Sequence, residues 1–194
     1  MFRRQREEKA IFGQGGTATR YRMRQNLVAI GDDFAIENEA GQKVYKVDGK
    51  VLRIRDTLHF KDMEGKLLCR IKERLIAITD SMTIEDGQGK DLASIHKALI
   101  SPLVDRYSVK VKDGPDLHIT GNLLDYEYDI KDGRDKVAEI SKKWFRITDT
   151  YGVEIAPGQN EILILAITVA VDMLVHKQKN RRHKEKDRRQ GDTQ

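Results

Sequence analysis

Hydrophobic and polar residues alternate along most of this chain, and four segments repeat one pattern without gaps. In each segment two apolar residues are one position apart, Asp or Asn follows, Gly comes three positions later, and another apolar residue closes the pattern. The first three copies recur every 24 residues. The copies are Phe34, Ile36, Asn38, Gly41 and Val44; Leu58, Phe60, Asp62, Gly65 and Leu68; Met82, Ile84, Asp86, Gly89 and Leu92; and Phe145, Ile147, Asp149, Gly152 and Ile155.

Each copy predicts a strand, a tight turn and a second strand. Alternation places the apolar side chains on one face, as the two-residue period of a strand requires. Asp or Asn opens the turn because its short side chain bonds the backbone just ahead, and Gly takes a positive φ at no steric cost. The residues to which we assign these structural roles include Asp62, Gly65, Asp86, Gly89, Asp149 and Gly152.

Further alternating runs lie between the copies, at residues 51–54, 75–78, 107–111 and 117–120. An imperfect fifth copy turns at Asp132-Gly133, a dipeptide typical of hairpins. The total is about a dozen strands over residues 20–155, with no long amphipathic helix among them. The pattern therefore predicts an all-β meander, arranged as a sandwich or a barrel.

The pattern changes at residues 162–175, which are almost entirely apolar. Asn160 can cap a helix and Glu161 favours its N-terminus, so we expect a helix near residues 160–176. Mapped on that helix, apolar side chains fall on every side. A bilayer span needs about 20 apolar residues, and this shorter run contains Asp172.

The protein interior can also accept such a helix. About 15 residues span about 22 Å at 1.5 Å per residue, and an eleven-stranded barrel is known to hold a central helix. We therefore expect a central helix enclosed by the strands; a monotopic segment or tail anchor is the alternative, because basic residues follow directly. Within this helix Asp172 should reach the barrel mouth or pair with Lys142, Lys143 or Arg146, since a buried unpaired carboxylate is costly.

The net charge of +5 is concentrated at residues 177–194, where eight Lys and Arg stand against three acidic residues. This segment has no aliphatic or aromatic residue, so we expect a disordered basic tail, just as we expect residues 1–19 to be a flexible leader. The tail either keeps the chain in solution or contacts an anionic lipid surface or RNA. Its candidate contact residues are Lys177, Lys179, Arg181, Arg182, Lys184, Lys186, Arg188 and Arg189.

Composition excludes several classes of protein. Charged residues make up 35% of the chain, which excludes a conventional membrane protein. Cys69 is the single cysteine, so no intramolecular disulfide can form and a reducing, cytoplasmic setting is expected, peripheral to a membrane if the tail binds lipid. The charged start of the sequence lacks the apolar run of a signal peptide.

A search for catalytic chemistry finds no GxSxG, HExxH, CxxC, Walker or dinucleotide-binding pattern. The glycine-rich residues 13–17 fit a flexible leader better than a phosphate-binding loop. Cys69 fits a small core residue better than a nucleophile. Trp144 is either packed under a loop or exposed for partner contact. The five histidines are not closely paired, and residues 86–91 lack the spacing and closing Glu of an EF-hand. We predict no catalytic residues, metal or cofactor.

Three features of the sequence occur together: the hairpin series, the apolar final helix and the stretch between them at residues 140–153. This stretch contains Lys142-Lys143-Trp144-Phe145 and Asp149-Thr150-Tyr151-Gly152. Together they resemble the LURP-one-related family of the tubby-like superfamily, which also holds the phospholipid scramblases. The resemblance covers roughly residues 20–176 and implies a twelve-stranded β-barrel closed around a hydrophobic C-terminal helix. It implies no established enzymatic activity, whereas tubby relatives bind phosphoinositides and scramblases act at membranes.

These observations lead us to expect a non-enzymatic tubby-like module that binds or scaffolds a partner, either a protein or an anionic phospholipid surface. One alternative is an enzyme or small-ligand carrier with a pocket at the barrel mouth. Another is RNA contact through the basic tail.

Overall fold

A computed structural model describes residues 18–24, 33–48, 57–76, 79–97, 106–144 and 150–191. The alternating run at residues 51–54 and the leader up to residue 17 lie outside these ranges. The described strands are β1 (Thr19–Arg24), β2 (Phe34–Asn38), β3 (Lys43–Asp48), β4 (Thr57–Asp62), β5 (Leu67–Ile76), β6 (Thr79–Asp86), β7 (Asp91–Lys97), β8 (Arg106–Val111), β9 (Leu117–Asn122), β10 (Glu127–Asp132), β11 (Asp135–Ser141) and β12 (Thr150–Ile155). A 3-10 turn, η1 (Leu123–Asp125), and one helix, α3 (Glu161–Gly191), complete the described elements.

The strands form one closed antiparallel barrel in which each strand pairs with its neighbours in sequence. Strand β1 closes the barrel because it pairs with both β12 and β2. Tyr21 is opposite Val153 on one side and Asn38 on the other. The predicted fold class, a twelve-stranded barrel with a central helix, is confirmed.

Three hairpins of the repeat share one turn geometry. The side-chain oxygens of Asn38, Asp62 and Asp86 each accept a hydrogen bond from the backbone N–H four residues on, at 2.8–2.9 Å. Gly65 and Gly89 follow with φ of +88° and +90°. In each hairpin the strand register shifts by one residue just before the turn, so the 24-residue period repeats a turn with its bulge.

The fourth copy of the repeat does not form such a turn, and the prediction for Gly152 is wrong. Strand β12 begins at Thr150, and Gly152 pairs with Arg22 of β1 and Ser141 of β11. The apolar spacing that precedes a hairpin also fits a strand buried between two neighbours, and every residue of β12 is buried. Asp149 lies outside the described residues.

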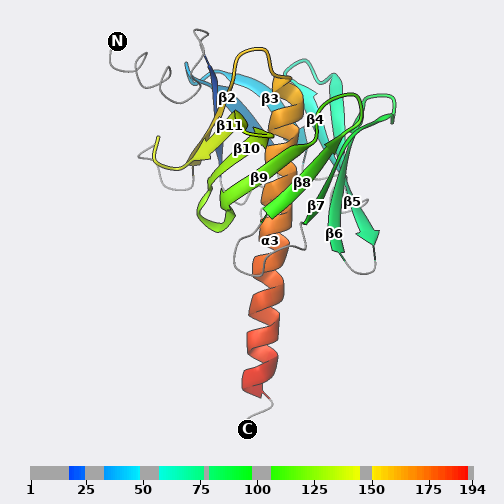
Figure 1. The fold of residues 1–194 in the computed structure, drawn as a ribbon, viewed down its shortest axis with the longest axis vertical. Helices are drawn as coiled ribbons and strands as arrows, with labels where there is room; N and C mark the ends of the chain where they lie inside the picture. The colour runs from blue at the N-terminus through cyan, green and yellow to red at the C-terminus, as the bar shows by residue number, and fades with distance from the viewer. Residues whose placement is uncertain are drawn as a thin grey trace.

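Helix α3 runs through the barrel, as Figure 1 shows. Every residue from 164 to 175 is at most 3% exposed, and the helix contacts β5, β6, β7 and β12. Its start is the predicted one, because the side-chain oxygen of Asn160 accepts a hydrogen bond from the N–H of Leu163 at 3.1 Å. The prediction of an interior helix is confirmed. In the described ranges no helix has the length and hydrophobicity to cross a bilayer.

The helix continues well past the end that the sequence predicted. It runs to Gly191 instead of stopping near residue 176, and its last turns project from the barrel (Figure 1). The expectation of a disordered tail is therefore wrong for the backbone of residues 177–191. The physical reason is that these residues include neither Pro nor an earlier Gly and are rich in Lys, Arg, Glu and Gln, which have high helix propensity. Continuation from a preformed helix also avoids the cost of nucleation.

Candidate functional site

The projecting basic segment of α3 is the candidate site, and three polar contacts hold the helix that carries it. The first contact is at the N-terminal end of the helix. The carboxylate of Glu161 accepts hydrogen bonds from the hydroxyls of Thr19, at 2.6 Å, and Tyr21, at 2.5 Å. Burial, together with the hydrogen bond to Glu161, raises the pKa of Tyr21 well above its usual value. Strand β1 is thereby fixed to the first turn of α3.

The second contact lies where the helix is fully buried. Asp172 is 3% exposed and accepts a hydrogen bond from the hydroxyl of Tyr126 at 2.5 Å. The sequence predicted a basic partner or a position at the barrel mouth, so a tyrosine partner is a finding of the structure. Tyr126 follows η1 with φ of +54°, a backbone conformation that is uncommon for a bulky residue.

Aromatic residues surround the pair formed by Asp172 and Tyr126. The ring of Tyr151 stacks on that of Tyr126 with centroids 4.7 Å apart, and the ammonium of Lys142 lies 4.8 Å from the Tyr126 ring centre. Burial, and next the negative charge of Asp172, raise the pKa values of Tyr128 and Tyr151 well above their usual range. The hydroxyls of Tyr128 and Tyr151 therefore stay protonated beside the carboxylate of Asp172.

The third contact is the ion pair between Lys177 of α3 and Glu73 of β5. The Glu73 side chain is 5% exposed and that of Lys177 is 34% exposed, so the pair is partly removed from solvent. Lys177 is thus engaged by the barrel. The other predicted contact residues continue along the helix backbone, and their side chains lie outside the described part of the structure; they are Lys179, Arg181, Arg182, Lys184, Lys186, Arg188 and Arg189.

The structure also places other residues that the sequence analysis weighed as candidate reactive groups. Cys69 is fully buried, and burial raises the pKa of its thiol to about 12, so it has the environment of a core residue. Within those ranges no cluster of His, Cys, Asp and Glu has the geometry to hold a metal ion. Trp144 is half-buried. The glycine-rich residues 13–17 lie outside the described ranges.

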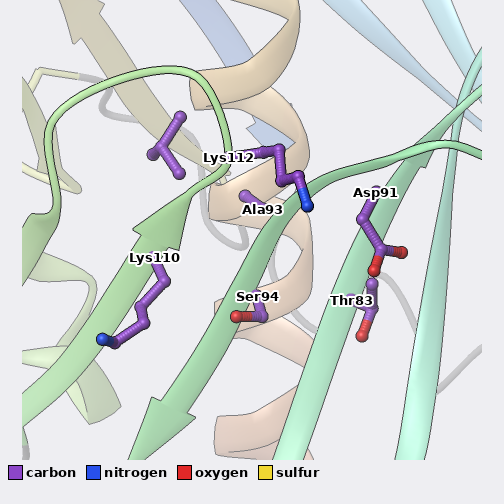
Figure 2. A pocket seen from close by; sticks show the side chains of 7 residues that line it. Thr83, Asp91, Ala93, Ser94, Lys110 and Lys112 are labelled. Carbon is purple, nitrogen blue, oxygen red and sulfur yellow. The ribbon is translucent and has the colours of Figure 1, made fainter.

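A pocket lies on the outer wall of the barrel, whereas the sequence analysis considered one at the mouth. It occupies about 180 Å³ over β6, β7 and β8 (Figure 2). Sequence reasoning missed this pocket because its residues are far apart in the chain and singly unremarkable. No local sequence signal marks it, because the alignment of Thr83 with Ser94 depends on the strand register. Its lining residues are Thr83, Asp91, Ala93, Ser94, Lys110, Val111 and Lys112.

Comparisons with known proteins agree with this architecture. The LURP-one-related family model matches residues 19–172. The chain is 26% identical over 154 residues to the uncharacterized protein YxjI of Bacillus subtilis, an alignment that covers 79% of this chain and 92% of YxjI. It is also similar to the crystal structure of an Arabidopsis thaliana protein, with a TM-score of 0.60 and 17% identity, covering 80% of this chain and 90% of that one. At that identity the likeness concerns the fold.

Proposed function

The chain belongs to the LURP-one-related family, and from this premise we propose that it is a non-enzymatic binding module whose projecting basic helix contacts anionic phospholipid surfaces. The observation that carries the proposal is the continuation of α3 beyond the barrel to Gly191 (Figure 1). A helix that starts inside a closed barrel presents its basic residues at a constant place on the molecule. A disordered tail would pay an ordering cost on contact that this helix avoids.

The charge of the projecting segment favours an anionic surface. Residues 177–194 contain eight Lys and Arg against three acidic residues. Each basic residue close to an anionic membrane contributes about 1 kcal/mol, and the contribution falls off within about one Debye length. Because the segment has no aliphatic or aromatic residue, it has no apolar face to insert into lipid. The contact we propose is therefore electrostatic and sensitive to salt.

Vesicle flotation tests the proposal. The full chain is mixed with vesicles of phosphatidylcholine alone or with phosphatidylserine added, at low and at high NaCl. A chain shortened after Gln178 keeps Lys177 and its contact with Glu73 and serves as the matched control. We expect the full chain to float with anionic vesicles at low salt only, and the shortened chain to remain unbound.

Two outcomes would overturn the lipid proposal. One is equal flotation with neutral and anionic vesicles, and the other is equal flotation of the full and shortened chains. If the full chain instead bound an RNA homopolymer at a salt concentration that abolished flotation, the basic helix would be assigned to nucleic acid, whose binding also depends steeply on salt.

A further inference from the structure

The outer-wall pocket has a floor built from paired positions on neighbouring strands. Thr83 of β6 is opposite Ser94 of β7, and Ser94 is opposite Lys110 of β8. Met82 and Ile84, on either side of Thr83, are fully buried in the core, so Thr83 projects from the other face of the sheet. Figure 2 shows Thr83, Ser94 and Lys110 with α3 behind the strands that carry them. Ala93, which is opposite the core residue Ile84, belongs to the core.

One hydroxyl in this floor lacks a partner. Thr83 is 3% exposed, and no group in the described residues forms a hydrogen bond with its oxygen. Leaving a buried hydroxyl unpaired costs about 1–3 kcal/mol, so its occurrence in a pocket points to a ligand that supplies the missing bond. The neighbouring Ser94 hydroxyl lies 3.1 Å from Nε2 of His96. When this nitrogen carries a proton it can donate to Ser94, which frees the Ser94 proton to point into the pocket.

The charged groups at the rim have few partners among the described residues. Lys112 and Asp91 both line the pocket, yet neither side chain has a hydrogen bond or ion pair to any group that the structure describes. Lys110 lies 4.0 Å from Asp116, and both side chains are largely exposed, so this contact is worth little in water. Lys112 and Asp91 therefore bring one ammonium and one carboxylate to the lining of the same small space, whereas the Lys110 side chain extends away from Ser94 (Figure 2).

We infer that this pocket binds a phosphate monoester whose esterified group carries a hydroxyl. A phosphate presents three acceptor oxygens and close to two negative charges at pH 7, which match the hydroxyls of Thr83 and Ser94 and the ammonium of Lys112. Directly paired residues have Cβ atoms about 5 Å apart, close enough for both hydroxyls to reach one phosphate. Asp91 repels phosphate, so it contacts the other end of the ligand, where it accepts a hydrogen bond from a hydroxyl.

The size and position of the pocket support a small ligand. Its volume of about 180 Å³ is below the range of about 300–1,000 Å³ that holds drug-sized molecules. Strand β5 ends toward the side from which α3 projects (Figure 1), so the antiparallel order places the β6–β7 turn toward the other end of the barrel. The pocket and the projecting helix therefore lie toward opposite ends, and this inference does not depend on the proposed function.

The inference is tested by NMR titration of the full chain with glycerol 3-phosphate and with inorganic phosphate, at constant ionic strength. We expect saturable shifts at the backbone amides of β6, β7 and β8. Thr83→Val should weaken binding roughly tenfold, the loss of one hydrogen bond to a charged group, while Thr83→Ser should retain it. Lys112→Gln should also weaken binding, whereas Lys66→Gln, which removes an exposed lysine outside the pocket, should not.

Asp91→Asn separates the two ends of the ligand. The substitution should raise the affinity for inorganic phosphate, because it removes a like charge. It should also reduce the preference of the pocket for glycerol 3-phosphate over inorganic phosphate. Vesicles that contain phosphatidic acid test whether the pocket also binds a phosphate group that belongs to a lipid. If they shift the same amides, the phosphate source is a headgroup, and if only the soluble ester does so, it is a free metabolite.

The inference is overturned if neither phosphate compound gives saturable shifts, or if Thr83→Val binds like the unchanged chain. The second comparison is meaningful because Thr83→Val removes an unpaired buried hydroxyl and should leave the melting temperature unchanged or raised. A failure of lipid flotation would leave this result untouched, because the titration uses soluble ligands.

Discussion

The hydroxyl of Tyr126 donates a 2.5 Å hydrogen bond to the carboxylate of Asp172, 46 residues away in the chain. Tyr126 follows a 3-10 turn of the wall and Asp172 lies in the enclosed helix, so this bond joins the barrel to its central helix. Tyr126 and the Tyr151 ring stacked on it form a matched pair for mutagenesis, because the buried hydroxyl of Tyr151 has no hydrogen-bond partner in the described residues.

Tyr126→Phe should lower the free energy of unfolding by about 1–3 kcal/mol, because it takes a donor from a buried carboxylate. Tyr151→Phe should leave that free energy unchanged or raise it. Urea denaturation followed by the fluorescence of Trp144, the single tryptophan, measures both. Equal effects of the two substitutions would show that the bond between Tyr126 and Asp172 adds nothing to stability.

The ion pair of Lys177 with Glu73 should show a coupling energy of about 1 kcal/mol in a double-mutant cycle with Lys177→Gln and Glu73→Gln. This coupling energy is at the upper end of those found for exposed ion pairs. We expect it because the Glu73 side chain is largely buried. The exposed pair of Lys90 with Asp113 is the matched control and should couple weakly. If the two cycles gave the same coupling energy, Lys177 would have no special role in seating the helix.

Two glycines should respond to alanine for different reasons. Gly65 has φ of +88° and open space around an added Cβ. Gly65→Ala should therefore lower the free energy of unfolding by about 1–2 kcal/mol, the cost of a left-handed backbone conformation for a residue with a Cβ. Gly65→Asn should lower it less. At Gly121 an added Cβ would lie 2.6 Å from backbone atoms of Glu127 and Tyr128. Gly121→Ala should therefore lower the melting temperature further than Gly65→Ala, and the reverse order would contradict the close approach of β9 and β10.

Burial raises the pKa of the Cys69 thiol to about 12 from 9.0, which favours its protonated form in the folded chain. The resulting stability is present in full below pH 9 and is lost as the pH rises from about 9 to about 12. The difference in unfolding free energy between the unchanged chain and Cys69→Ala should shrink over that range. A thiol reagent at pH 8 should label Cys69 only as urea unfolds the protein, and rapid labelling without urea would show that the thiol is accessible.

Local features of the fold were readable from sequence. The turns at Asp62 and Asp86 depend on a side chain that bonds its own neighbouring backbone and on a glycine a few residues away. The start of α3 depends likewise on the cap at Asn160. The apolar run that follows could only be buried on all sides, which required a wall of many strands. These inferences succeeded because each depends on residues close together in the chain.

Pattern alone failed where two structures fit the same residues. Gly152 has the spacing of a turn glycine, yet it lies in β12, because the pairing of β12 with both β1 and β11 is a long-range contact. The residues after Val175 have nothing to bury, but they extend a helix that is already nucleated inside the barrel. Composition indicates whether a segment has apolar surface to bury. It does not show whether the preceding residues already form a helix that the segment can continue.

The order of strands and a helix buried on every side follow from the sequence, since periodicity and turn chemistry act within a few residues. The tyrosine partner of Asp172 and the alignment of Thr83 with Ser94 were decided by the closed barrel. Both depend on register between segments that are 11 or more residues apart. Register depends on the packing of the whole sheet around the helix, and a shift of one residue would turn Thr83 to the opposite face.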